Sequence, residues 1–489
     1  MPRLALTVSL LLVAAAGCVE RDPIDPPIDP PIEPPIDPPI DPPIDPPPVV
    51  TTCPVSGTSP FASLAVTDPE VLARFGFARV FDRIRATAAV TSAQSSVAIY
   101  QAWWRTFGAS AALGDCDDPG VDPEGYGLRC PRTPELALAS VNPLSPASPV
   151  RLVPVGLFNR LDLAPVDGRH CGEYRIVYAL ALSPGAPFGG RGFVIFEAAL
   201  PNPTPAAGVD GCLPVARFWQ ALSAEPDPGV RAARLEQFYL TGGAVPGFPA
   251  VVDAHHYGLA DGAGAAFGAG QIRTNMFVDN VEWGLREFKL RRRCADPATC
   301  RLTFEHVAAK ANPAEALFAG THPRSAAFLA GFVAQLRGLV GGDAATLALD
   351  VPEVADTFES VATPGTANVR YAARASVATR AELQRGLLAL DAPLTTTNVL
   401  ARATTQTCAG CHEVSSNADL GGGLRWPPSN GFTHVDESGQ LSPALLDVFL
   451  PHRLDVLEGF INARCGTARP REASDPRLTI GGGVVGNAN

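Results

Sequence analysis

Residues 22–48 repeat Pro-Pro-Ile-Asp with little variation, and this repeat constrains the fold more than any other feature of the chain. Proline fixes φ and removes the backbone donor, so the segment cannot supply helices or strands to a core. It predicts an extended polyproline II linker that reaches on the order of 80 Å at about 3.1 Å per residue. Acidic side chains repel one another along it and stiffen it further: Asp22, Asp25, Asp29, Glu33, Asp37, Asp41 and Asp45.

The residues before this linker have the pattern of an export signal. Arg3 supplies a positive charge, residues 4–14 form an apolar stretch too short to span a bilayer, and three small residues precede Cys18. This leader resembles a bacterial lipoprotein signal, which implies that residues 1–17 are removed and that a lipid on Cys18 anchors the chain to a membrane. Val19 is not the Asp that commonly retains lipoproteins at the inner membrane, so we expect the outer membrane, facing the periplasm or the cell surface. An ordinary secretory signal is the alternative.

The charge of the chain is concentrated in the linker. Residues 22–48 carry seven units of the net −11, which leaves about −5 for the body from Thr51 onward. The longest cationic run is Arg291-Arg292-Arg293, and no basic stripe surrounds it. We therefore expect no nucleic-acid partner.

The body and tail together contain 439 residues, enough for a large folded unit. Short segments rich in Val, Ile, Tyr and Phe lie in its centre, and segments with helical periodicity lie on both sides, which predicts an α+β fold rather than an alternating parallel sheet. The predicted strands are 150–157, 173–182, 192–200, 272–278, 283–290 and 300–306. The predicted helices are 92–106, 214–223, 229–240, 325–339 and 380–390. A capping box at 67–70 further predicts one continuous helix to about Thr87.

The most specific chemical pattern is Cys-Ala-Gly-Cys-His at residues 408–412. Covalent haem attachment needs two thiols for the two vinyl groups of one porphyrin and an imidazole beneath the iron. A two-residue gap puts both sulfurs on one turn, and the two small residues between them let the macrocycle approach the backbone. The motif predicts haem c bound through Cys408 and Cys411, with His412 as the proximal iron ligand.

This motif resembles the attachment site of c-type cytochromes. The resemblance implies a small, mostly helical haem-binding region at 393–466 and electron transfer with a redox partner protein. It leaves a body at 51–392 without an assigned role, a linker at 18–50 and a flexible tail at 467–489. A peroxidase-like haem enzyme and a non-haem lipoprotein that binds proteins or glycans remain as alternatives. The cysteine pair itself could instead belong to a thioredoxin-like centre, a zinc site or a structural disulfide.

The sixth iron ligand departs from the commonest cytochrome c pattern. None of the 77 residues after His412 is Met, and Met276 falls in a predicted strand, where a core role is favoured. His434 follows a loop rich in Gly and Pro that could return an imidazole to the distal face, so it is our predicted second metal ligand. His452 is the second choice.

The remaining cysteines predict a disulfide-bonded body. Removing Cys18 and the haem pair from the eleven cysteines leaves eight, an even number that suits an oxidising compartment. Sequence proximity pairs six of them, and the last two would join the start of the body to its end. The predicted disulfides are Cys116–Cys130, Cys171–Cys212, Cys294–Cys300 and Cys53–Cys465.

Overall fold

The computed structural model describes residues 53–91, 93–108, 131–278, 282–296, 298–307, 309, 313–349, 362–364 and 370–465. By its internal contacts the chain divides after Val49, and all described residues belong to the unit that begins at Val50. The predicted leader, linker and tail lie outside the described residues. No helix within the described ranges is long and apolar enough to cross a membrane.

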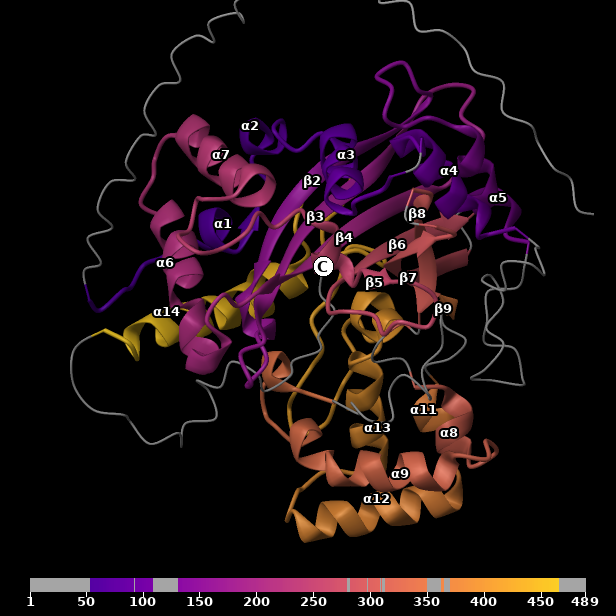
Figure 1. The fold of residues 1–489 in the computed structure, drawn as a ribbon. Coiled ribbons are helices and arrows are strands. Elements are labelled where there is room, and N and C mark those ends of the chain that lie inside the picture. Colours follow the sequence, from indigo (N-terminus) through magenta and orange to yellow (C-terminus); the bar gives the residue numbers. More distant parts are fainter. Residues whose placement is uncertain are drawn as a thin grey trace, which may run out of the picture. The chain divides into compact units, whose positions relative to one another are not determined.

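The centre of the fold is a nine-stranded sheet in the described part of the chain, with the order β1-β2-β3-β4-β6-β7-β5 and with β8 and β9 also paired to β7 (Figure 1). All pairs are antiparallel except β5 with β7. This confirms the predicted α+β class. The strands are β1 Ala65–Val66, β2 Val150–Arg160, β3 His170–Leu182, β4 Arg191–Pro201, β5 Ala260–Asp261, β6 Gln271–Val278, β7 Glu282–Cys294, β8 Cys300–Val307 and β9 Ala362–Pro364.

All six predicted strands are present, as β2, β3, β4, β6, β7 and β8, and the observed strands are longer than predicted. Charged residues take part in strand pairing beyond the apolar segments, so they extend the strands instead of ending them. At the end of β2, for example, Arg160 pairs in register with Glu173 of β3.

The helices surround the sheet or form a separate group. They are α1 Pro60–Ser63, α2 Pro69–Leu72, α3 Phe77–Thr87, α4 Ser96–Arg105, α5 Thr133–Ala137, α6 Leu213–Leu222, α7 Pro228–Glu236, α8 Glu315–Ala319, α9 Ser325–Ala334, α11 Tyr371–Arg374, α12 Val377–Ala389, α13 Thr396–Thr405 and α14 Leu450–Asn462. Short 3₁₀ or π-helical turns include η2 Leu161–Leu163, η4 Gln237–Thr241, η6 Leu336–Leu339, η8 Gly410–Val414 and η9 Ala444–Phe449.

The continuous helix predicted from residues 67–70 to Thr87 is wrong. Asp68 caps α2 by accepting a hydrogen bond from the Glu70 N–H, and α2 ends at Leu72. A second helix, α3, then begins after Gly76, whose backbone is not helical. The apolar periodicity continues across this break, which is why the sequence pattern did not reveal it.

One face of the sheet packs against aromatic side chains of α3 and α4. The Phe77 ring contacts Tyr178 at 5.3 Å between centroids, and the Trp103 ring stacks on Phe304 at 4.3 Å and contacts Phe288 at 5.5 Å. We call this side of the sheet the aromatic face. It belongs to the larger of the two hydrophobic cores among the described residues, which also includes Cys408 and Cys411.

The opposite face carries a ladder of charged and polar side chains, which we call the charged face. It consists of Arg160, Glu173, Arg175, Glu197, Gln271, Arg273 and Glu287. Register places Arg175 opposite Glu197 and Arg273 opposite Glu287. All three arginines are only 1% exposed, and Glu197 and Glu287 are fully buried. Ion pairs across neighbouring strands join Arg175 to Glu197 and Arg273 to Glu197 and Glu287. Arg160 and Arg175 also pair with carboxylates two residues away along the chain, Asp162 and Glu173.

A second hydrophobic core joins the helices α8, α9, α11, α12 and α13, which Figure 1 shows as one group below the sheet. Phe318 lies at its centre, with its ring 4.3 Å from Tyr371 and 5.1 Å from Phe332. Val399 and Leu400 of α13 also belong to this core. It therefore fixes the helix that leads into the Cys-Ala-Gly-Cys-His motif.

Three of the four predicted disulfides are confirmed: Cys171–Cys212, Cys294–Cys300 and Cys53–Cys465. The Cys53–Cys465 bond joins residues 412 positions apart, and Asn462 reinforces it with hydrogen bonds to both backbone groups of Val55. The predicted Cys116–Cys130 pair lies outside the described residues.

Candidate functional site

The helix α13 positions the motif. A capping box between Thr395 and Asn398 starts the helix, and the buried Arg402 side chain fixes its far end. The Arg402 guanidinium donates to four backbone oxygens at 2.7–2.9 Å: those of Leu339, Gly341, Leu420 and Gly421. The same side chain thus ties the motif helix to the helical group and to the loop that follows the motif.

The motif itself forms a tight helical turn directly after α13. The Thr407 hydroxyl oxygen accepts a hydrogen bond from the Gly410 N–H at 2.9 Å, and the Cys411 N–H donates to the Thr407 carbonyl at 2.8 Å. A Cβ at Gly410 would lie 1.7 Å from the Thr404 oxygen, so only glycine fits there. Cys408 and Cys411 therefore share one turn, neither is in a disulfide, and neither has exposed surface.

His412 points into the protein and is held by the sheet. Its Nδ1 lies 2.9 Å from the Phe432 carbonyl oxygen, which also accepts a 3.2 Å hydrogen bond from the Asn275 amide of β6. Trp283 of β7 stacks on the Phe432 ring at 4.8 Å and lies 5.8 Å from the His412 ring. The sheet thus fixes the His412 ring through Phe432.

The loop that returns from the motif brings His434 to the same place. Its Nε2 lies 3.5 Å from Cys411 Sγ, and its ring centroid lies 4.9 Å from that of His412. Its Nδ1 lies 2.9 Å from Ser442 Oγ, and this hydroxyl also accepts from the Leu445 N–H at the start of η9. His434 and Ser442 are both buried.

Both nitrogens of the His434 ring lie beside a polar atom, with Nε2 3.5 Å from Cys411 Sγ and Nδ1 2.9 Å from Ser442 Oγ. Burial, and then the neighbouring Cys408, raise the pKa of Cys411 to about 12. Both imidazoles are thus held at Nδ1 by a protein oxygen. Metal-ligating histidines are commonly oriented in this way, with Nε2 as the metal-binding atom.

Buried arginines lie close to this cluster. Arg453 of α14 is 4% exposed, and Arg160, Arg175 and Arg273 belong to the charged face. Burial, His412 and Arg453, in that order of size, hold the pKa of His434 well below its usual range. Arg273 interacts electrostatically with Cys408. The motif therefore lies over the charged face rather than the aromatic face.

The donor types suit a haem, because two cysteines outside any disulfide and two imidazoles, those of His412 and His434, meet at one place. Two imidazoles on opposite sides of one metal have ring centres roughly 6 Å apart for metal–nitrogen bonds of about 2 Å. The 4.9 Å between His412 and His434 is about 1 Å shorter than that spacing. The two rings thus lie closer together in this structure than they would with a metal between them.

The structure places the three candidates for the sixth iron ligand in different surroundings. It brings His434 to the motif, places His452 half-buried in α14, and packs Met276 of β6 against Gly192. Among the residues that are described, no group of three or more His, Cys, Asp and Glu side chains is arranged to hold a metal ion. A haem iron needs only two protein ligands because the porphyrin supplies the other four.

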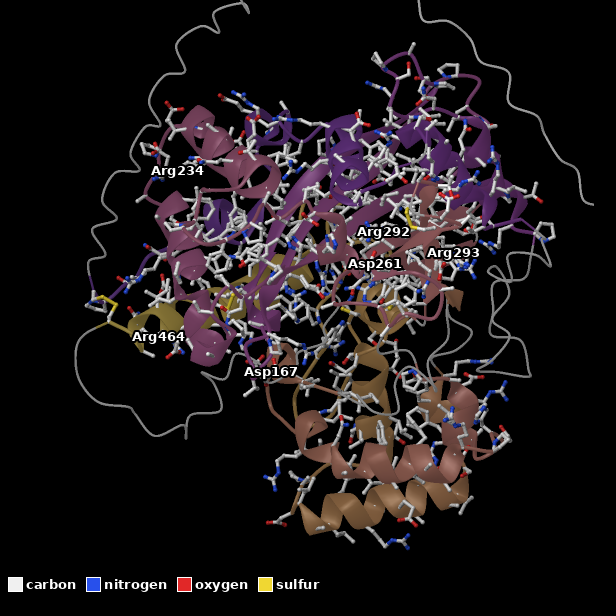
Figure 2. The ribbon with its side chains drawn as sticks, viewed as in Figure 1. Asp167, Arg234, Asp261, Arg292, Arg293 and Arg464 are labelled. Atoms are coloured by element: carbon white, nitrogen blue, oxygen red, sulfur yellow. A yellow bond between two sulfur atoms is a disulfide. The ribbon has the colours of Figure 1, made fainter. Side chains whose placement is uncertain are left out.

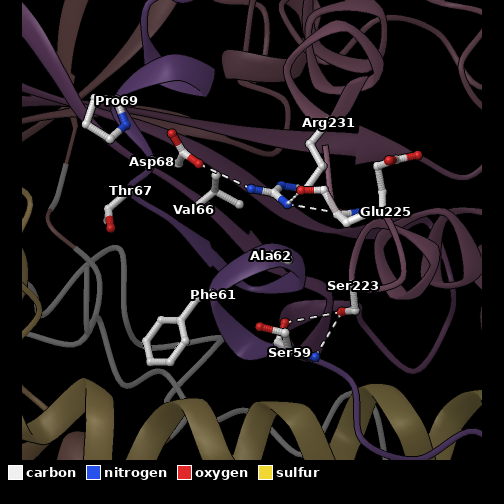
Figure 3. Close-up of a pocket in the computed structure, with 11 residues that line it drawn as sticks. Ser59, Phe61, Ala62, Val66, Thr67, Asp68, Pro69, Ser223, Glu225 and Arg231 are labelled. Carbon is white, nitrogen blue, oxygen red and sulfur yellow. Dashed lines mark hydrogen bonds and ion pairs between the residues drawn. The ribbon is translucent and has the colours of Figure 1, made fainter. Parts of the chain in front are cut away.

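A surface pocket of about 540 Å³ lies between α1, α2 and the start of α7, away from the motif (Figure 3). Arg231 crosses it to form a 3.2 Å ion pair with Asp68 and a 2.8 Å hydrogen bond to the Glu225 carbonyl. Ser223 closes its floor through a hydrogen bond from the Ser59 N–H at 2.9 Å. The polar groups of this pocket thus satisfy one another.

Sequence reasoning missed Arg453, Ser442 and Trp283 as neighbours of the motif. It also missed the charged face, although charged residues two apart inside predicted strands, such as Glu173 and Arg175, were a usable signal. Arg453 and Ser442 carry no such signal, because only the path of the loop at 415–443 brings them to the cluster.

Comparisons of the chain with protein-family models, curated proteins and solved structures found no match in any of the three.

Proposed function

We propose that this protein is an outer-membrane-anchored lipoprotein that carries one covalent haem c and exchanges electrons with a redox partner protein. The observation that carries the proposal is the meeting of two cysteines outside any disulfide, on one turn, with two imidazoles held at Nδ1. The other described cysteines are all used in disulfides.

Each residue of the cluster has a distinct role in this proposal. Cys408 and Cys411 would hold the cofactor through thioether bonds, and His412 and His434 would ligate its iron. Bound haem would supply one-electron redox chemistry. Phe432 and Ser442 would orient the two imidazoles through their Nδ1 atoms.

The N-terminal segments complete the proposal. A lipid on Cys18 would hold the chain at the membrane, and the proline-rich linker at 18–50 would keep the folded unit at a distance from the bilayer. A redox partner could then approach the protein from the aqueous side.

Expression with a periplasmic haem-maturation system tests the function. We expect a haem-stained band at the protein's mass on denaturing gels and a c-type pyridine haemochrome spectrum, both lost in Cys408→Ala/Cys411→Ala. A matched control, Cys294→Ala/Cys300→Ala, removes a disulfide and should keep the haem. Extraction of all colour from the wild type by acid acetone would contradict covalent attachment. Absence of any pyridine haemochrome spectrum would favour a non-haem lipoprotein instead.

A further inference from the structure

The helix α12 carries apolar side chains on two opposite sides. Leu383 and Leu387 belong to the second hydrophobic core, and Gly386 lies against Val333 and Leu336 of the same group. The opposite side of α12, which we call its outer face, is exposed to solvent and consists of Val377, Ala378, Ala381, Gln384, Arg385, Leu388 and Ala389. Figure 1 shows α12 at the end of the helical group farthest from the sheet. A helix that is apolar all round is normally covered all round, so the outer face has the composition of a contact surface.

The outer face holds the two most exposed large apolar side chains among the described residues. Val377 is 87% exposed and Leu388 is 71% exposed. They lie about three helical turns apart and therefore share one line along the helix. Alanines lie beside them at positions 378, 381 and 389, so a second helix can approach the face closely.

The sizes of these side chains make the outer face complementary to itself when two copies of α12 run antiparallel. One register places Leu388 of one copy opposite Ala378 of the second copy. The same register places Val377 opposite Ala389 of the second copy. Each large side chain thus meets an alanine, and a two-fold axis repeats every contact.

The charges of α12 favour the same register. Glu382 and Arg385 form an ion pair at one edge of the outer face, and their side chains are 45% and 65% exposed. In an antiparallel pair with this register the two edges meet, so Glu382 of one copy lies beside Arg385 of the second copy. Opposite charges then face each other twice, which selects this pairing over a shifted one.

We propose that the outer face of α12 binds a second copy of this chain in an antiparallel, two-fold symmetric pair. This proposal goes beyond the proposed electron transfer and does not depend on bound haem. The helix is about 20 Å long, so the paired faces are smaller than a standard interface and the dimer is weak and reversible. A lipid surface fits the outer face less well, because helices that bind the membrane interface carry Trp, Phe or several Leu residues rather than alanines.

Sedimentation equilibrium of the full-length chain, in a detergent matched to the solvent density, tests the pair. We expect a monomer–dimer equilibrium with a dissociation constant on the order of 10–100 µM. Leu388→Glu should weaken it at least about tenfold, because a carboxylate would replace the side chain that packs on Ala378. Since Leu388 is exposed in the single chain, this variant should keep the wild-type circular dichroism spectrum.

Val166→Glu is the matched control. Val166 is 66% exposed, close to the value for Leu388, and lies in a turn of the sheet region beside Asp167, which Figure 2 shows at the surface. This variant should dimerise like the wild type. A wild-type chain that stays monomeric to about 500 µM, or a dimer that Leu388→Glu leaves unchanged, would overturn the proposal.

Mixing two charge variants tests the antiparallel register. Arg385→Glu and Glu382→Arg should each weaken the dimer about three- to tenfold, because each puts like charges at the edge where the two copies meet. An equimolar mixture should restore the wild-type affinity, since a mixed pair again places opposite charges side by side. No preference for the mixed pair would overturn the antiparallel arrangement. Binding of the monomer to phosphatidylcholine vesicles, lost in Leu388→Glu, would replace the second copy by a lipid surface.

Discussion

The two faces of the central sheet differ in chemistry although the same strands build them. On β4, Phe196 points to the aromatic face and lies 5.9 Å from the Tyr178 ring, while the next residue, Glu197, points to the charged face. The aromatic face packs against α3 and α4, and the charged face lies beneath the motif. The strands thus separate a stabilising surface from a polar one.

The difference shows where burial serves stability and where it does not. Aromatic contacts on one face contribute through area and ring geometry. Buried ion pairs on the other face contribute little net stability, because the desolvation cost offsets their attraction. The chain keeps this costly ladder on the side where the cysteine motif lies, which associates the charged face with the site rather than with folding alone.

The largest expected effect comes from substituting these neighbouring residues of β4. Glu197→Leu removes the carboxylate that Arg175 and Arg273 share, and it should lower the unfolding free energy by about 3–5 kcal/mol. Phe196→Leu removes volume but no charge and should cost about 1–2 kcal/mol. Chemical denaturation of both variants measures their unfolding free energies. A smaller loss of unfolding free energy for Glu197→Leu than for Phe196→Leu would contradict the difference between the two faces.

A second prediction concerns the support of His434 over the charged face. Ser442→Ala removes the oxygen that holds Nδ1 at 2.9 Å. Loss of a hydrogen-bond partner that orients a metal ligand typically weakens metal binding about 10–100-fold. We expect a high-spin fraction in the haem spectrum of Ser442→Ala, which Ser442→Thr should largely restore. An unchanged low-spin spectrum in Ser442→Ala would argue against His434 as a ligand.

The smallest expected effect is a pH dependence that originates on the aromatic face. His306 of β8 packs 4.4 Å from Phe288, and burial, with Arg286, holds its pKa well below the usual 6.5. The unfolded chain therefore binds a proton that the folded chain does not. The contribution of His306 to stability is complete above about pH 6.5 and falls as the pH drops toward the folded pKa, by up to about 1.4 kcal/mol per unit.

Denaturation curves between pH 7 and 5 test this sign. His306→Phe should show a shallower loss of stability with falling pH than the wild type. His255→Gln, at an exposed position, should follow the wild type. Parallel slopes for all three proteins would show that His306 titrates alike in the folded and unfolded chains.

The sequence by itself determined the local features of this protein. Short segments rich in Val, Ile, Tyr and Phe predicted six strands of the sheet, and sequence proximity predicted the Cys171–Cys212 and Cys294–Cys300 disulfides. These features depend on residues close together along the chain, so residue order is enough. The same holds for the turn at residues 408–412, which needs only the two-residue gap and Gly410. The Cys53–Cys465 disulfide was predicted only because the other cysteines had been paired first.

Tertiary structure alone decided what surrounds that turn. His434, Ser442 and Arg453 come from a loop and a helix that follow the motif, while Trp283 and Asn275 come from strands more than a hundred residues before it. Which imidazole reaches Cys411 depends on how the loop at 415–443 packs on the sheet. No local propensity encodes that path, because the energy that selects it is spread over contacts between distant segments.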